Sequence, residues 1–283
     1  MTHVRNRPWY STANARLSQA LRRDGFQSRV KTSILQCMTL ALSTILPAYN
    51  EAERLPPFLD SVRRHLDEHY QGRYEVIVVD DGSCDNLADV LKAAAVDWSE
   101  LVVITHGKNR GKGAAVRTGM LAAKGERMLF ADADGATPID QEAQLSEAIS
   151  AGADVAIGSR LIGEGEATRE RTRLRGLAGR LFAALARRWL GIKVRDTQCG
   201  FKMFSREAGR KLFSSSTENG YLFDLELLVL ARRFAYEVAE VPVDWTEVPG
   251  GHLSMSKEFG RIVGGLWRLK RRLSGSASGS PGS

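Results

Sequence analysis

No run of about 18 apolar residues occurs in the 283-residue sequence, and a membrane-spanning helix needs a run of at least that length. An apolar stretch at residues 34–46 follows a basic segment, as in a secretory signal. It continues into Pro47 without a small-residue cleavage site. We therefore predict a buried strand there, no membrane span, and a cytoplasmic protein.

Cysteine is scarce as well. The three cysteines, Cys37, Cys84 and Cys199, lie far apart and form no CxxC pair. Disulfide-stapled domains and structural zinc sites need clustered cysteines. The sequence therefore predicts unpaired thiols in a reducing compartment.

Two common phosphate-binding motifs are also missing. Gly111 and Gly113 follow a predicted strand, but the pattern GxxxxGK[ST] is absent and Val116 stands where a dinucleotide fingerprint has its third glycine. The sequence therefore excludes a Walker A loop and disfavours a dinucleotide-binding site.

The charge is positive and unevenly spread. Forty Lys and Arg face 33 Asp and Glu, a formal net charge of +7, and the excess lies mostly at residues 160–188 and 257–272. Such patches suit phosphates, anionic lipid head groups or nucleic acid. Aromatic residues do not alternate with the basic ones, so we predict no nucleic-acid partner.

Strands and helices alternate along most of the chain. Several predicted strands are continuously apolar, which is typical of a parallel sheet covered by helices on both faces. The predicted strands span 40–46, 75–79, 101–105, 127–131, 154–158 and 237–245, and the predicted helices span 51–70, 85–96, 112–124, 139–150, 173–190, 223–234 and 257–273. The fold class is therefore α/β, with a mostly parallel central sheet flanked by helices in a single domain.

This domain is expected to span residues 38–255. Residues 1–37 are basic and lack periodicity, so we interpret them as an extension outside the fold. Residues 256–273 are predicted to form a basic amphipathic helix that either packs on the domain or contacts a membrane surface. Residues 274–283 are rich in Ser and Gly and are predicted to form a flexible tail.

The strongest chemical signal is the pair Asp132 and Asp134 after a buried strand. Two carboxylates this close are costly to bury unpaired, and Mg²⁺ typically takes one or two carboxylates together with phosphate oxygens. A solvated acidic turn explains the pair equally well when it is taken alone. Polar residues also end the strands before Asp80 and Arg160, so we expect the chemistry at the carboxyl edge of the sheet.

Four further motifs, in order along the chain, carry a resemblance to a known family. Segments 47–51, 79–83, 109–113 and 158–160 resemble those of family 2 glycosyltransferases, which have the Rossmann-like GT-A fold. Segments 196–202, 223–227 and 244–247 are most similar to dolichyl-phosphate β-glucosyltransferases and bacterial polyprenyl-phosphate glycosyltransferases.

The resemblance implies a set of site residues. Those implied for the donor nucleotide are Pro47, Tyr49, Glu51, Asp80, Asp81, Arg110, Lys112 and Asp132. Asp134 and Asp132 would hold Mg²⁺ or Mn²⁺, with Ala136 where some relatives have a further Gln ligand. Arg160, Arg173 and Arg175 would bind the acceptor phosphate. Asp224, with Glu226 as the alternative, would act as the base or position the acceptor.

The implied reaction is an inverting, metal-dependent transfer of a hexose, glucose from UDP-glucose, to a polyprenyl or dolichyl phosphate, with peripheral contact at the cytoplasmic face of a membrane. Three alternatives stay open: a soluble hydroxyl acceptor, GDP-mannose as the donor, and a binding protein on a transferase scaffold.

Overall fold

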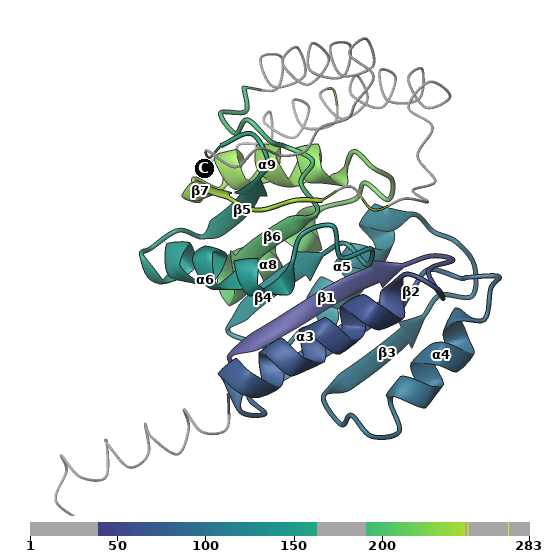
Figure 1. Ribbon diagram of the computed structural model, residues 1–283. Coiled ribbons are helices and arrows are strands. Elements are labelled where there is room, and N and C mark those ends of the chain that lie inside the picture. The colour runs from purple at the N-terminus through teal and green to yellow at the C-terminus, as the bar shows by residue number, and fades with distance from the viewer. Residues whose placement is uncertain (1–38, 163–190, 247, 249–270, 272–283) are drawn as a thin grey trace, which may run out of the picture. The chain divides into compact units, whose positions relative to one another are not determined.

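The protein is described from a computed structural model. It describes residues 39–162, 191–246, 248 and 271 (Figure 1). All helices and strands given below lie in the structural unit Leu40–Ser283. The predicted helices at 173–190 and 257–273, the extension 1–37 and the tail 274–283 lie outside the described residues, apart from residue 271.

The described part of the chain builds a seven-stranded sheet with the strand order β3-β2-β1-β4-β6-β5-β7. The strands are β1 (Leu42–Ala48), β2 (Tyr74–Asp80), β3 (Leu101–Thr105), β4 (Arg127–Ala131), β5 (Val155–Ser159), β6 (Phe201–Ser205) and β7 (Val238–Pro242). Neighbouring strands are parallel, except that β6 runs antiparallel to both β4 and β5. The predicted α/β class with a mostly parallel sheet is confirmed.

Helices cover both faces of this sheet (Figure 1). They are α3 (Leu55–Tyr70), α4 (Leu87–Ala94), α5 (Lys112–Ala122), the 3-10 turn η1 (Ile139–Gln141), α6 (Glu142–Ser150), α8 (Arg206–Ser215) and α9 (Phe223–Arg233). One apolar cluster joins α3, α4 and α6 to one face, and a second joins α5, α8 and α9 to the other. Every residue of β1 and β2 is buried, which explains their mostly apolar sequences.

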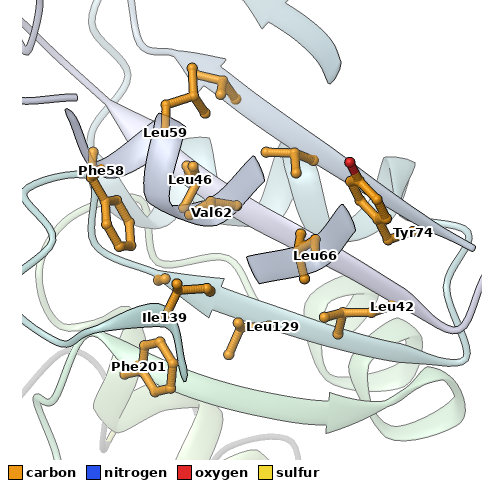
Figure 2. Packing of buried hydrophobic residues seen from close by; sticks show 14 of the residues in the cluster. Leu42, Leu46, Phe58, Leu59, Val62, Leu66, Tyr74, Leu129, Ile139 and Phe201 are labelled. Atoms are coloured by element: carbon orange, nitrogen blue, oxygen red, sulfur yellow. The ribbon is translucent and has the colours of Figure 1, made fainter. Parts of the chain in front are cut away.

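In helix α3 the apolar residues that the sequence pattern predicts as one helix face are the ones that pack on the sheet. Its apolar residues recur at helical spacing and lie over β1 and β4 (Figure 2). The buried set is Leu55, Phe58, Leu59, Val62, Leu66 and Tyr70. Burying one such large apolar side chain contributes roughly 1.5–3 kcal/mol. The helix begins four residues later than predicted, because residues 51–54 form a turn closed by a 2.9 Å bond from Leu55 N to Glu51 O.

Strand β6 and helix α8 were not predicted. The strand is five residues long, and its apolar run is interrupted by Lys202, which breaks both the alternating and the continuous apolar pattern. In the fold, Lys202 is only 1% exposed. Helix α8 starts at a capping serine, Ser205, whose hydroxyl accepts a 3.2 Å bond from Ala208 N.

The sheet topology collects loops at one edge. Because β1 to β5 and β7 all point the same way, their carboxyl ends lie at this edge. The antiparallel β6 contributes its amino end there, since Phe201 pairs with Ala131 at the end of β4. Ser159 and Pro242 likewise pair at the ends of β5 and β7. Residues from the seven strands therefore meet at the carboxyl edge of the sheet, where the sequence analysis predicts the active site.

Within the described residues, no helix has the length and apolar character needed to cross a bilayer. Cys84 and Cys199 are free thiols, and burial raises the pKa of the Cys199 thiol to about 11. Cys37 lies outside the described residues.

Candidate active site

The loops after β1 and β2 are bonded to each other. Asn50 N donates to Ser83 Oγ at 3.0 Å, and Cys84 N donates to Asn50 Oδ1 at 2.9 Å. Gly82 has φ +75°, and a Cβ atom there would lie 2.5 Å from the carbonyl carbon of Lys108. Lys108 lies in the loop after β3, so only glycine at position 82 allows this approach of the loop after β2 to the loop after β3.

The residues predicted for the nucleoside pocket differ in exposure. Tyr49 is 40% exposed and offers an aromatic surface at the edge of the sheet. Pro47 is buried inside β1 opposite Val79. Glu51 is held by Arg54, whose Nε donates to Glu51 Oε2 at 2.7 Å. Contact of these residues with a nucleotide stays a prediction.

Asp80 and Asp81 are both 2% exposed, and Asp81 builds the next loop. The Asp81 carboxylate lies 2.6 Å from His106 Nδ1 and accepts bonds from the backbone N–H groups of Arg110 at 3.0 Å and Gly111 at 2.7 Å. Asp80 accepts a 2.9 Å bond from a backbone N–H three residues later. Asp81 therefore fixes the backbone that leads into α5, and a nucleotide would have to compete for it.

Helix α5 begins at Lys112, directly after Gly111, whose φ is +101°. The Lys112 ammonium lies 2.6 Å from Asp132 Oδ1 and 5.5 Å from the centre of the Phe130 ring. Burial works to lower the pKa of Lys112, but the carboxylates of Asp132 and Asp224 outweigh it and raise that pKa. Lys112 is thus a fixed positive charge beside the first carboxylate of the pair.

Asp132 and Asp134 follow β4 and are both partly exposed. Asp132 N donates to Gly200 O at 2.9 Å, and a Cβ atom on Gly200 would lie 1.9 Å from Asp132 Oδ2. Asp134 Oδ1 accepts a 3.1 Å bond from Ala136 N. Among the described residues, no group of three or more His, Cys, Asp or Glu could hold a metal. Asp132 Oδ1 is a buried oxygen that accepts no hydrogen bond from the described residues. Two partly exposed carboxylates with such an oxygen still fit a Mg²⁺ or Mn²⁺ that takes its other ligands from phosphate and water.

Next to this carboxylate pair lies a buried ion pair between Asp224, which the sequence analysis assigned to the site, and Lys202, which it did not. Lys202 Nζ lies 2.6 Å from Asp224 Oδ1 and also donates to Cys199 O. The two side chains are 2% and 6% exposed. Burial raises the pKa of Asp224, against the lowering effect of Lys202 and Lys112. Asp224 is therefore enclosed by cations.

Glu226 faces a different part of the protein. It is 2% exposed and accepts bonds from the backbone N–H groups of Thr217 at 3.0 Å and Glu218 at 2.8 Å. Asp224 and Glu226 thus have separate partners, as expected for residues two apart on a helix. Asp224 contacts Lys202 and raises the pKa of Lys112, the lysine that lies next to Asp132.

Arg160 has a bidentate partner of its own. Its Nε and Nη2 donate to the two oxygens of Asp196 at 2.7 and 2.8 Å, and its guanidinium lies 5.4 Å from the ring centre of Trp245. Burial works to raise the pKa of Asp196, but Arg160 lowers it below its ordinary value. Glu240 Oε1 in turn accepts a 2.8 Å bond from Asp196 N. An acceptor phosphate at Arg160 would have to compete with Asp196.

The remaining predicted arginines are placed differently. Arg110 is exposed on the loop before α5. Arg173 and Arg175 lie outside the described residues, so their predicted contact with an acceptor phosphate stays a prediction.

The sequence analysis did not assign three residues to the site: Asp196, Gly200 and Lys202. All three lie in the segment 196–202, which carried part of the family resemblance. A lysine inside an apolar run was the available signal, because lysine is almost never fully buried without a partner. The identity of that partner, Asp224, depends on the fold.

Comparison with known proteins agrees with this geometry. The family model described as "Glycosyl transferase family 2" matches residues 43–213, from β1 to α8. The chain belongs to glycosyl transferase family 2. It is therefore a glycosyltransferase, as the resemblance implied.

The similar curated proteins are dolichyl-phosphate beta-glucosyltransferases. The human protein is 38% identical over 270 residues, covering 87% of this chain and 83% of that protein. The Drosophila melanogaster protein is 42% identical over 254 residues, covering 82% and 78%. The Saccharomyces cerevisiae protein is 37% identical over 232 residues, covering 76% and 70%.

Solved structures confirm the GT-A fold. Glucosyl-3-phosphoglycerate synthase from Mycobacterium tuberculosis in complex with UDP has a TM-score of 0.62 at 22% identity, covering 83% of this chain and 80% of that one. A complex of the same enzyme with Mn²⁺ and UDP-glucose also has a TM-score of 0.62 at 22% identity, covering 81% and 78%.

Proposed function

We propose that this glycosyltransferase transfers glucose from UDP-glucose to a polyprenyl phosphate of the dolichyl type, with inversion at the anomeric carbon. The observation that carries this proposal is the identity of 37–42% to dolichyl-phosphate beta-glucosyltransferases from yeast, human and fly over most of the chain. The matched length includes the carboxylates, lysines and arginine of the site described above.

Asp132 and Asp134 are the residues that would hold a divalent metal. When bound, such an ion supplies positive charge to the diphosphate leaving group. The use of Mn²⁺ with UDP-glucose by an enzyme of the same fold supports this choice. Lys112, 2.6 Å from Asp132, adds a fixed positive charge at the same place. In the proposed reaction these cations would stabilise the negative charge that grows as UDP leaves.

The acceptor requires little help from a base. A phosphate monoester with a second pKa near 6 is already largely ionised at neutral pH. Asp224 is held by Lys202 at 2.6 Å and is 4% exposed. We propose that Asp224 positions its neighbours rather than abstracting a proton. An Asp224→Asn variant is then expected to keep turnover within about tenfold of the wild type, whereas loss of a true general base costs roughly 10²–10⁴-fold.

The test is transfer of label from UDP-[³H]glucose in detergent micelles containing polyprenyl phosphate and Mg²⁺ or Mn²⁺. We expect label to move into the butanol phase, chelation of the metal to stop the transfer, and NMR of the product to show a β-linked glucose. The Asp132→Asn/Asp134→Asn double variant serves as the inactive control.

Other acceptors and donors form the competing arms of this experiment. Label that stays in the aqueous phase as a new product with 3-phosphoglycerate or a saccharide would replace the lipid acceptor by a soluble one. Transfer from GDP-mannose but not from UDP-glucose would overturn the proposed donor. Nucleotide binding without transfer to any acceptor would favour a binding protein.

A polyprenyl acceptor lies in a bilayer, so we propose that the enzyme binds at the membrane surface. Basic surface charge of the kind found in this chain binds anionic lipid. Flotation with vesicles containing anionic lipid is expected to carry the protein upward, and neutral vesicles or high salt are expected to leave it in the bottom fraction.

A further inference from the structure

The Lys112 ammonium lies 2.6 Å from Asp132 Oδ1, a buried oxygen that accepts no hydrogen bond from the described residues. We propose that Lys112 is an internal counter-ion that keeps the divalent metal off Asp132 until a nucleotide diphosphate binds. This inference rests on the proposed function, since it takes the same metal and the same class of nucleotide as ligands.

The start of α5 is held firmly, so Lys112 has a defined reach. Gly111 N donates to Asp81 at 2.7 Å. A Cβ atom on Gly111 would lie 2.5 Å from Asn219 O, and one on Gly113 would lie 2.6 Å from Glu218 O. The helix start is thus packed against the segment before α9. The Lys112 side chain, 25% exposed, extends from this fixed point to Asp132.

The neighbouring charges leave Asp132 as the partner of Lys112. The other nearby carboxylate, Asp224, is already paired with Lys202 at 2.6 Å. Lys112 and Lys202 also lie 5.5 and 5.9 Å from the centre of the same Phe130 ring, so both ammonium groups are close to this ring. The described charges alternate as Lys202, Asp224, Lys112 and Asp132.

A divalent ion on Asp132 would meet the Lys112 ammonium beside it. Like charges at such short range repel strongly where water is partly excluded. The metal therefore binds only if the ammonium moves or gains another anion. A diphosphate supplies that anion, because its oxygens accept charge-assisted bonds from lysine. Lys112 then shifts its bond from Asp132 to the diphosphate, and Asp132 Oδ1 becomes open to the metal.

Two consequences follow for binding. The metal alone binds weakly, and the nucleotide and the metal each strengthen the binding of the other by the same factor. A lysine that served only as a diphosphate ligand would produce the second effect without the first. The affinity of the nucleotide-free protein for metal therefore distinguishes the two roles of Lys112.

The experiment measures Mn²⁺ binding by EPR of free Mn²⁺, with and without UDP, on the full-length protein. For Lys112→Met we expect Mn²⁺ alone to bind at least about tenfold tighter than to the wild type, because a like charge is removed. Lys112→Arg keeps the charge and is expected to keep the weak binding. The matched control Lys108→Met removes an exposed lysine of the preceding loop and is expected to leave Mn²⁺ affinity within about twofold.

A further variant tests whether the tighter Mn²⁺ binding of Lys112→Met occurs at Asp132. Adding Asp132→Asn to Lys112→Met is expected to abolish the tighter binding, and circular dichroism checks that each variant is folded. If the wild type binds Mn²⁺ with UDP, but Lys112→Met binds Mn²⁺ alone no better than the wild type, the counter-ion role is wrong and the proposed function stands. If the wild type binds no Mn²⁺ even with UDP, the counter-ion role and the metal in the proposed function both fall.

Discussion

Two ion pairs lie side by side at the carboxyl edge of the sheet, and each has an N–O distance of 2.6 Å. In the pair Lys202–Asp224 the side chains are 2% and 6% exposed, whereas in the pair Lys112–Asp132 they are 25% and 34% exposed. A buried pair is costly to break, because each charge left alone has lost its water. An accessible pair exchanges partners with a ligand. Equal distances thus support different roles: the first pair holds the structure, and the second is the pair that we propose to meet the substrate.

The largest effect separating the two pairs is expected in stability. Lys202→Met leaves the Asp224 carboxylate buried without its cation, so we expect the free energy of unfolding to fall by about 3–5 kcal/mol. Lys112→Met breaks an accessible pair and is expected to cost less than about 1 kcal/mol. Urea unfolding followed by circular dichroism measures both. Lys202→Met combined with Asp224→Leu is expected to recover part of the loss, and equal losses in the two single variants would remove the distinction.

For catalytic activity we expect the order of the two pairs to be reversed, with the larger effect at Lys112–Asp132. Asp132→Asn removes a charge from the proposed donor site, so we expect kcat/KM to fall roughly 10²-fold or more, while the free energy of unfolding changes by less than about 1 kcal/mol. The matched control is Asp140→Asn at an exposed position of η1, which is expected to retain full activity. Steady-state kinetics with UDP-glucose would contradict this ranking if Asp132→Asn kept more than half of the wild-type value.

A third pair sharpens the comparison through pH. Arg160–Asp196 is intermediate, with side chains 27% and 6% exposed, and Arg160 lowers the pKa of Asp196. A carboxyl whose pKa is depressed on folding stabilises the protein above its unfolded pKa of about 3.9, and this contribution is lost as the pH falls through the folded pKa. We therefore expect Asp196→Asn to cost about 2 kcal/mol between pH 5 and 8, with the difference from the wild type shrinking below about pH 4. Urea unfolding at a series of pH values measures this, and a cost that grew toward low pH would contradict it.

The smallest expected effect concerns the geometry of the accessible pair. In Gly200→Ala the new methyl group meets the Asp132 carboxylate, with Cβ 1.9 Å from Oδ2. Because the end of a side chain moves aside easily, we expect activity to fall about tenfold while the free energy of unfolding changes by less than about 1 kcal/mol. Gly107→Ala is the control, since a Cβ atom there has nothing within 4 Å. A loss of stability larger than the loss of activity would assign Gly200 to the buried structure.

The first four strands were predictable because their signals are local. The strands at 101–105 and 127–131 were placed at their observed ends, and β1 and β2 shifted by no more than two residues. In β2 and β4 a mostly apolar run leads into an Asp, and nearly all residues of both strands are buried. Strand β3 was recognised by its apolar, β-branched residues although most of them are exposed or half-buried. The carboxylates at 132 and 134 were also recognised in the sequence. A solvated acidic turn explains the pair alone, and the motifs that surround it carry the family resemblance.

The sequence pattern failed where a residue depends on a distant partner. Lys202 reads as a polar interruption of an apolar run, yet it is 1% exposed because Asp224 lies opposite. Arg160 was predicted as a phosphate ligand on its position after a strand, and the structure pairs it with Asp196, 36 residues away. Neither ion pair follows a periodicity or a fixed residue spacing that could be recognised in the sequence.

The sequence by itself determined the alternation of strands and helices, the α/β class, the acidic loops after the strands and the resemblance to family 2 glycosyltransferases, since these depend on local periodicity and short motifs. Only the tertiary structure decided that β6 enters antiparallel between β4 and β5, which brings Gly200 and Lys202 beside Asp132 and Asp224. The physical reason is that charge pairing in a buried site depends on distance and on exclusion of water. Both are properties of the packed sheet rather than of neighbours along the chain.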